Sequence, residues 1–242
     1  MLSLAREVTV GGSWHDIPMS EMISVGGMTQ PRDKLLAYAR DYLNPENNYA
    51  YPAYDAYHGS GSAQVEDVDL LAIVLLNAGQ RPLPTYYTLH RLLPQINERL
   101  ADPRLTGTFA EASQTTVEAI ADLFGILDDH RPTDYVGKTK LLKVLHRKRP
   151  ELIPLYDENI RRLYSETPNP PVPRDTKRTH REFALAWLPA LQRDLVAYHD
   201  LWQEIVAMAD PKAPITELRA LDIVAWKMGS NVASTSGKPR TS

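Results

Sequence analysis

Apolar residues recur at the spacing of α-helices along most of the chain. The run over 66–78 is apolar on nearly every side and ends at Gly79, which predicts a buried central helix. Prolines interrupt the pattern after residue 81 and predict two short helices, at 85–93 and 94–100. The fold class is predicted to be all-α, as a single globular helical domain. Further helices are predicted at 31–43, 115–129, 179–209 with a break at Pro189, and 216–228 with an end at Gly229.

The segments outside these helices divide the chain. Residues 1–30 are punctuated by glycine and predict an irregular arm with one short strand near 7–10. The helical domain then spans 31–229 and contains a proline-rich stretch, 166–174, which predicts a stiff spacer before a carboxy-terminal helical extension. Residues 230–242 are small and polar and predict a disordered tail.

Composition narrows the possible functions only modestly. A net charge of -3 with 43% hydrophobic residues is typical of an ordinary soluble protein, so any positive surface must be local. The absence of cysteine excludes disulfides, thiolate nucleophiles and cysteine-held metal centres, and it favours the cytoplasm. The longest apolar run, 70–76, is too short to span a membrane, and the first residues lack the pattern of a signal peptide.

Charge is segregated between Tyr135 and Pro150, where the chain carries several lysines and arginines and no acid. Leu141, Leu142 and Val144 supply a buried helical face, so the cations are expected on the opposite face. A helix that begins after a glycine presents free backbone N–H groups that bind phosphate. The alternative is a solvated basic face paired with acids elsewhere. The predicted nucleic-acid-binding residues are Gly137, Lys138, Lys140, Lys143, Arg147, Lys148 and Arg149.

The same stretch carries a family resemblance. The segment VGKTKLLKVLHRKRPELIPLYDENI resembles the core of a bacterial family known only as domain of unknown function 6308, which shares a glycine turn, a KLL helix, a KRP basic end and an IP-x-YD element. The segment LRALDIVAWKM, 218–228, resembles the closing helix of that family. Together with looser matches, the resemblance extends from about Tyr54 to Met228.

This core is also similar in layout to the helix-hairpin-helix DNA glycosylases. That resemblance implies a glycine hairpin that grips the DNA backbone and a catalytic aspartate about twenty residues later. Gly137 and Asp157 are 157 − 137 = 20 residues apart, so Asp157 is the implied catalytic residue. Two positions depart from the pattern: Tyr135 stands where the first hairpin glycine would be, and Thr139 stands where bifunctional members carry a lysine nucleophile.

Asp157 also has a simpler interpretation. It stands directly before a short predicted helix, the position of an amino-terminal cap, and we favour the cap slightly over catalysis. The two roles are compatible in one residue. If Asp157 is catalytic, the resemblance implies that it stabilises positive charge on the deoxyribose or positions water, while a flipped base enters a pocket lined by aromatic residues.

Other polar and aromatic groups are also candidates for chemistry. The tyrosines of the loop 44–62 would either stack on bases or, as we favour, plug the edge of the core with their hydroxyls in water. Asp128, Asp129 and His130 would hold a metal ion or, more simply, be solvated, and no metal or cofactor is predicted. Asp222 lies in an apolar helix, where it would reach solvent on the narrow polar face or pair with a buried base, for example on the basic helix. The simpler expectation is a pair with Arg219 or Lys227 outside the core.

Three functional hypotheses therefore stand. The first is a protein that binds DNA or another nucleic acid through the basic element, and the second is a glycosylase-like enzyme that excises a base with Asp157. The third is a protein-interaction scaffold whose basic helix meets an acidic partner. The sequence leaves open whether the protein is an enzyme.

Overall fold

The computed structural model describes residues 22–129 and 134–235, and within them the chain is a globular, mostly helical domain with one two-stranded sheet. This confirms the all-α fold class. None of the described helices is long and apolar enough to cross a membrane. The elements are β1 (Met22–Val25), β2 (Met28–Pro31), α1 (Arg32–Leu43), the 3-10 helices η2 (Pro45–Asn47) and η3 (Asp67–Leu71), α2 (Ala72–Leu75), α3 (Pro82–Leu100), α4 (Gln114–Phe124), α5 (Ile126–Asp129), α6 (Lys138–Lys148), α7 (Glu158–Ser165), α8 (His180–Ala197), α9 (His199–Val206) and α10 (Glu217–Thr235).

The hairpin β1–β2 lies inside the segment expected to be an irregular arm. Its strands pair antiparallel, with Met22 opposite Pro31, and Gly26 and Gly27 form the turn with φ angles of 55° and 80°. Such angles favour glycine, which explains why this turn is a glycine pair. The strand expected at 7–10 lies outside the described residues.

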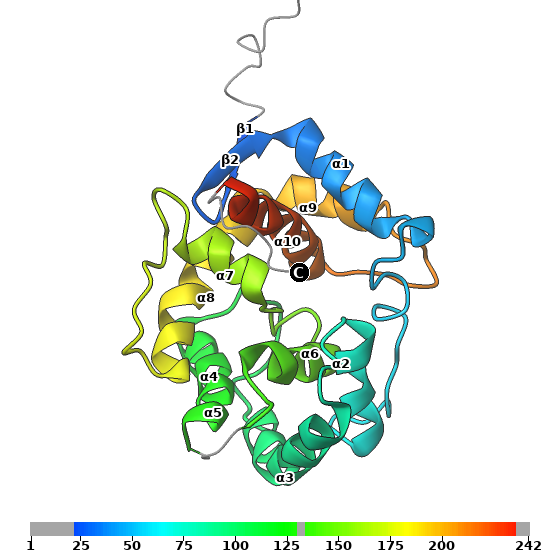
Figure 1. The fold of residues 1–242 in the computed structure, drawn as a ribbon, viewed down its shortest axis with the longest axis vertical. Coiled ribbons are helices and arrows are strands. Elements are labelled where there is room, and N and C mark those ends of the chain that lie inside the picture. Colours follow the sequence, from blue (N-terminus) through cyan, green and yellow to red (C-terminus); the bar gives the residue numbers. More distant parts are fainter. Residues whose placement is uncertain (1–21, 130–133, 236–242) are drawn as a thin grey trace, which may run out of the picture.

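Helix α10 organises one end of the molecule, where it packs on α7, α9 and α1 (Figure 1). The helix does not end at Gly229, as the sequence predicted, but continues to Thr235. A Cβ atom at position 229 would lie 2.0 Å from the carbonyl oxygen of Asn159, so glycine is needed here for the close approach of α7. Residues 230–235 of the expected tail thus belong to a helix, and 236–242 lie outside the described residues.

The run over 66–78 is not the central buried helix that its apolar composition predicts. It forms the short helices η3 and α2 at the surface, and the side chains of Val68, Leu71 and Val74 are 42–55% exposed. Asp69 accounts for much of the difference, because its carboxylate accepts hydrogen bonds from the backbone N–H groups of Ser60 and Glu66. These bonds tie the first turn to a loop rather than to a regular helix.

Two prolines expected to end helices lie inside them instead. Helix α3 runs through Pro94 as a single element, and α8 runs through Pro189, so the break in the last helical region falls at Tyr198. A proline removes one backbone hydrogen bond. Buried side chains on both sides of each proline, such as Ile96 in α3 and Leu191 in α8, keep the helix continuous.

The proline-rich stretch 166–174 contains neither helix nor strand. It nevertheless returns to the core, because Val172 is buried and its N–H donates to the carbonyl oxygen of Tyr164 at 3.0 Å. The predicted helix at 115–129 is divided at Gly125 into α4 and α5. Helices α4 and α8 pack together and complete the core between the two ends of the molecule.

Candidate functional site

The turn that leads into α6 is made without a glycine at its first position. Tyr135 has a φ of 74°, in the left-handed region that glycine favours, and the guanidinium of Arg81 lies over its ring at 5.2 Å. Gly137 then begins α6 as its amino-terminal cap and is exposed. The backbone turn therefore accommodates the tyrosine. Residues 130–133 of this connection lie outside the described residues.

Helix α6 is buried on nearly every side. Its leucines and Val144 are buried as expected, but Lys143 and His146 are also only 7% and 1% exposed. The expectation that the cations cover a solvent face opposite the leucines is therefore incorrect for Lys143. Burial lowers the pKa of His146 to about 4, and its Nδ1 lies 2.7 Å from the carbonyl oxygen of Ile153.

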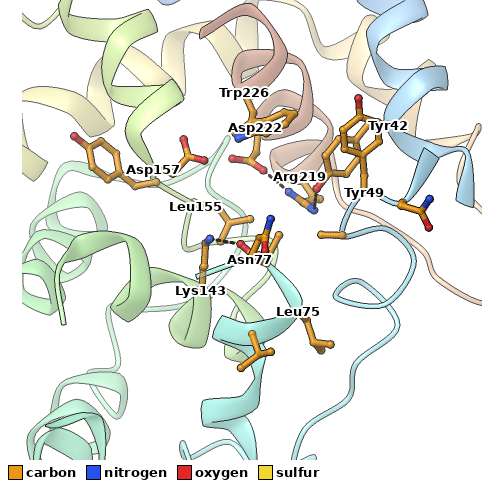
Figure 2. Close-up of a pocket in the computed structure, with 15 residues that line it drawn as sticks. Tyr42, Tyr49, Leu75, Asn77, Lys143, Leu155, Asp157, Arg219, Asp222 and Trp226 are labelled. Atoms are coloured by element: carbon orange, nitrogen blue, oxygen red, sulfur yellow. Dashed lines mark hydrogen bonds and ion pairs between the residues drawn. The ribbon is translucent and has the colours of Figure 1, made fainter. Parts of the chain in front are cut away.

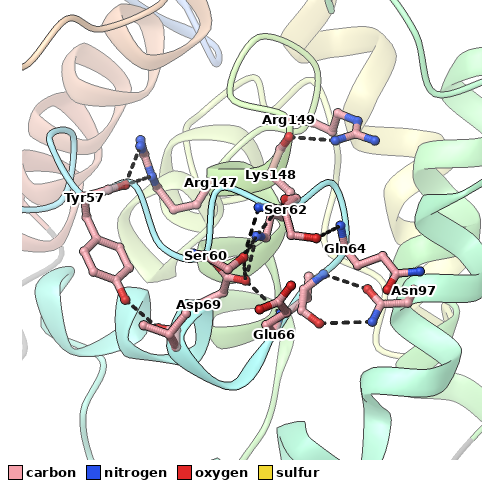
Figure 3. Close-up of polar contacts among 12 residues, drawn as sticks. Tyr57, Ser60, Ser62, Gln64, Glu66, Asp69, Asn97, Arg147, Lys148 and Arg149 are labelled. Carbon is pink, nitrogen blue, oxygen red and sulfur yellow. Dashed lines mark hydrogen bonds and ion pairs between the residues drawn. The ribbon is translucent and has the colours of Figure 1, made fainter.

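The cations at the end of α6 make contacts within the protein (Figure 3). Lys148 forms an ion pair with Asp69 at 2.6 Å, with both side chains buried, and Arg147 donates two hydrogen bonds to the carbonyl oxygen of Tyr57. Arg149 donates to the carbonyl oxygen of Lys148. These contacts fasten the loop between η2 and η3 onto α6.

The first turn of α6 holds the remaining two predicted binding residues. Lys140 donates to the carbonyl oxygen of Gln80 at 3.0 Å and to the hydroxyl of Thr85 at 2.7 Å. Lys138 lies 3.2 Å from Nδ1 of His180, and burial lowers the pKa of both side chains, so the imidazole is neutral near pH 7. These hydrogen-bond partners carry no charge, the carboxylate of Asp128 attracts Lys138, and both lysines are partly exposed. Their positive charge thus remains available at the start of the helix.

A pocket of about 470 Å³ separates α1 and α10 from α2 and α6 (Figure 2). It brings together segments that are distant in the sequence. Its charged residues are Lys143, Asp157, Arg219 and Asp222, and aromatic side chains from both ends of the chain form part of its wall. The lining residues are Tyr42, Asn48, Tyr49, Ala50, Val74, Leu75, Leu76, Asn77, Lys143, Leu155, Tyr156, Asp157, Arg219, Asp222 and Trp226.

Asp157 caps α7 and lines this pocket. Its Oδ1 accepts hydrogen bonds from the backbone N–H groups of Asn159 at 2.9 Å and Ile160 at 3.0 Å, which confirms the predicted cap. Both hydrogen bonds reach the same oxygen, and none to Oδ2 is found among the described residues. The cap therefore holds the carboxylate in a fixed orientation and leaves one oxygen for a ligand.

Lys143 is the lysine of the pocket. Its Nζ donates to the carbonyl oxygen of Leu76 at 2.5 Å, and Asp157 and Asp222 face it across the pocket (Figure 2). Burial lowers the pKa of Lys143, and the two carboxylates partly oppose that effect. Thr139, the nearby α6 residue considered from the sequence, does not line the pocket.

Helix α10 contributes one buried arginine, Arg219, which has several partners. Arg219 binds Asp55 through Nε at 2.9 Å and through Nη2 at 3.2 Å, and it also donates to the hydroxyl of Tyr42 and to Asp222. Asp222 pairs with Arg219 as expected, but Arg219 is buried, so the pair does not lie outside the core; Lys227 pairs with Asp41. Burial raises the pKa of Asp222 to about 6, with a further increase from Asp157, against the opposing charge of Arg219.

The aromatic wall joins helix α1, the tyrosine loop and α10. The rings of Tyr42 and Tyr49 stack at 5.0 Å, and Trp226 meets both edge-on. Within the same loop Tyr51 and Tyr54 are buried plugs, as we favoured, but their hydroxyls bind protein groups rather than water: Tyr54 donates to the carbonyl oxygen of Lys143, and Tyr51 accepts from the N–H of Asp210. One loop thus serves both the core and the pocket.

Asp128, in α5, makes a structural contact with α8. The carboxylate of Asp128 accepts hydrogen bonds from the backbone N–H groups of His180 at 2.8 Å and Arg181 at 3.0 Å, at the start of α8. This acid is therefore engaged rather than merely solvated. His130 and the side chain of Asp129 lie outside the described residues. In the part of the chain that the structure describes, no three histidine or acidic side chains are grouped as a metal site.

Comparison with known families gives one match. The model of a family of unknown function, DUF6308, matches residues 35–229. The chain belongs to the DUF6308 family. No curated protein and no solved structure matches the chain. The matched range includes every residue that lines the pocket, from Tyr42 to Trp226, so the pocket is built entirely within the DUF6308 region.

Proposed function

We propose that this DUF6308 protein binds nucleic acid and removes a base from it in the pocket between α6 and α10. The observation that carries the proposal is the arrangement of the Asp157 carboxylate. Two backbone N–H groups hold its Oδ1, and its other oxygen receives no hydrogen bond from the described residues. The residue lines a pocket with an aromatic wall. The sequence resemblance of residues 136–160 to helix-hairpin-helix DNA glycosylases supports the same function.

The composition of the pocket suits a planar base. Trp226 contributes aromatic surface to the wall, and extruded bases stack on such surface in enzymes that act on nucleotides. The Tyr49 ring lines the same pocket, stacked on Tyr42 and beneath Nζ of Lys227 at 4.0 Å. Asn77 and Lys143 add groups that hydrogen-bond to the edge of a base. A wall of this kind together with a few polar groups is the usual composition of a small-molecule site.

Asp157 would act on the sugar. Cleavage of the bond between sugar and base leaves positive charge on the sugar carbon, and a fixed carboxylate nearby stabilises that charge or orients the attacking water. The two backbone hydrogen bonds to Oδ1 hold the group in place before the substrate arrives. Little reorganisation is then needed during the reaction.

The first turn of α6 would hold the phosphate backbone. Gly137 is exposed, the helix presents its free N–H groups there, and Lys138 and Lys140 add positive charge. Lys143 and the three cations at the end of α6 make internal contacts, so they contribute less to the proposed interface. Binding should therefore depend on Lys138 and Lys140 more than on Lys148.

The test is base release from a panel of oligonucleotides that carry damaged, mismatched or ordinary bases, as single strands and as duplexes. We expect wild-type protein to release at least one base and Asp157→Asn to lose about 10²-fold or more in rate. The matched control is Asp200→Asn, at an exposed position of α9. No release from any oligonucleotide would reject the enzyme. If the Asp157→Asn protein also melts early, helix capping is then the only role left for Asp157.

Binding is tested separately from chemistry. We expect the affinity for DNA to fall steeply with salt, and the Lys138→Met, Lys140→Met double variant to reduce the salt slope by about one for each phosphate that is no longer neutralised. Lys177→Met, at an exposed position outside α6 in the sequence, is the matched control. A protein that binds neither DNA nor RNA at low salt would contradict the proposed function as a whole.

A further inference from the structure

The charged side chains that line the pocket, together with Asp55 behind Arg219, do not balance. Two cations, Arg219 and Lys143, face three carboxylates, Asp55, Asp157 and Asp222. Arg219 binds both oxygens of Asp55. Asp55 therefore already compensates much of the charge of Arg219, and less of that charge is left to stabilise an ionised Asp222. With all three carboxylates ionised the cluster carries one excess negative charge in a largely buried site. A single proton makes it neutral.

The surrounding groups direct that proton to Asp222. Asp55 is held by two hydrogen bonds from Arg219, and Asp157 is held by two from backbone N–H groups. Asp222 receives one, from Nη1 of Arg219 to Oδ2. Its Oδ1 has no hydrogen-bond partner in the described part of the chain, and the residue lines the pocket (Figure 2).

The other titratable groups around Asp222 leave this assignment unchanged. On α1 the hydroxyl of Tyr42 carries no charge near pH 7, because burial raises its pKa. At the rim Asp41 and Lys227 pair with one another. On α6 the ring of His146 is buried, and its pKa is about 4, so it is neutral near pH 7.

We propose that Asp222 is a second catalytic residue, the neutral carboxylic acid that gives its proton to the departing base. This inference rests on the proposed function and extends it to the substrate: the leaving group must be a base with an unprotonated ring nitrogen that receives the proton. The geometry that carries it is one pocket with two carboxyl groups. Asp157 is held in place by its backbone hydrogen bonds, and Asp222 has an oxygen that no described residue binds.

The step balances as a hydrolysis. The bond between the sugar carbon and the base nitrogen breaks, its electron pair goes to the base, and the proton on Asp222 moves to a ring nitrogen of the base. Water attacks the sugar carbon from the pocket and loses a proton to Asp157, so the sugar gains a hydroxyl. Exchange with solvent then returns a proton to Asp222 and removes one from Asp157.

The experiment combines a pH profile with a direct titration. Asp222→Asn keeps an oxygen that accepts from Arg219, and Asp200→Asn is the matched control. We measure single-turnover base release from about pH 4.5 to 8.5 and follow the side-chain carboxyl carbons by NMR over the same range. Wild-type release should fall as pH rises through the Asp222 midpoint near 6, and the Asn variant should be slower by about 10²–10⁴-fold and lack this limb.

Each outcome has one meaning. A carboxyl resonance with a midpoint near 6 that disappears in Asp222→Asn supports the assignment. An unchanged rate and pH profile in that variant overturns it, as does a wild-type spectrum in which every aspartate titrates in its ordinary acidic range. If wild-type protein releases no base, the proposed function fails, and the titration alone decides whether Asp222 stores a proton. Should the Asn variant melt, Asp222→Glu must retain the pH limb with a displaced midpoint.

Discussion

The Lys148–Asp69 ion pair separates a structural from a nucleic-acid-binding role for the basic helix. The side chains of these residues are 4% and 1% exposed, and their charged atoms lie 2.6 Å apart. Lys148→Met removes the charge and keeps the aliphatic stem. A nucleic-acid-binding lysine could be removed in this way without loss of stability, whereas a buried partner could not.

The magnitude follows from what Asp69 retains. Removal of one partner of a buried ion pair costs about 3–5 kcal/mol. The carboxylate of Asp69 keeps hydrogen bonds from Ser60 and Glu66, so we expect the lower end, a loss of about 3 kcal/mol in the free energy of unfolding. In a domain of this length such a loss lowers Tm by about 6–12 °C.

The assay is urea and thermal unfolding of wild type, Lys148→Met, Asp69→Asn and the double variant. We expect the double variant to be destabilised by about 0.5–3 kcal/mol less than the sum of the single effects, because the two residues interact directly. Lys177→Met, at an exposed position, should stay within about 0.5 kcal/mol of wild type. A Lys148→Met protein as stable as this control would refute the structural role.

The same pair predicts a pH dependence. Burial raises the pKa of Asp69, but hydrogen bonds from Lys148, Glu66 and Ser60 outweigh it, and the pKa lies below its ordinary value. A carboxyl with a lowered folded pKa stabilises the protein above its unfolded pKa of about 3.9, and this contribution is lost as the pH falls through the folded pKa. The advantage of wild type over Lys148→Met should therefore be full at pH 7 and shrink below about pH 4.

Two further predictions concern the core. Gly229→Ala should lower the free energy of unfolding by about 1–3 kcal/mol, since its Cβ would lie 2.0 Å from the Asn159 carbonyl oxygen; an unchanged urea midpoint would contradict the α7–α10 contact. The His146 ring should stay uncharged in NMR spectra until about pH 4, and its contribution to stability should be complete above about pH 6.5 and fall by about 1.4 kcal/mol per pH unit toward the folded pKa. A ring that titrates at its ordinary pKa would show that it is solvated.

The helical content and several helix bounds follow from local rules. Helix α1 falls where the spacing of Leu35, Leu36 and Ala39 places it, and Asp157 caps α7 as its position before Glu158 predicts. These features depend on neighbours within a few residues. They are readable without knowledge of the remaining chain.

Proline, glycine and apolar runs were less reliable guides. Pro94 and Pro189 lie inside helices, and Gly229 lies within α10 instead of ending it. In each case packing against distant segments outweighs the local preference. The apolar run over 66–78 also depends on tertiary packing, because no second layer of the described chain covers Val68, Leu71 and Val74.

The pocket itself could not be assembled from the sequence. Asp157 and Asp222 both stand out in the sequence, and the polar position of Asp222 in an apolar helix was the signal that could have joined them. Nothing local indicates that Lys143 turns toward them while Lys148 turns to Asp69. Both lysines lie in the same helix, and only the packing of other segments around it distinguishes them.

The sequence by itself determined that this protein is helical, that positive charge concentrates in α6 and that Asp157 caps the helix after it. Those properties arise from side-chain spacing and from contacts between near neighbours. The tertiary structure alone decided which charges are used inside the protein and which carboxylates share a pocket. Burial and pairing depend on where α1, α2, α6 and α10 meet, and helices so far apart in sequence are brought together only by folding of the whole domain.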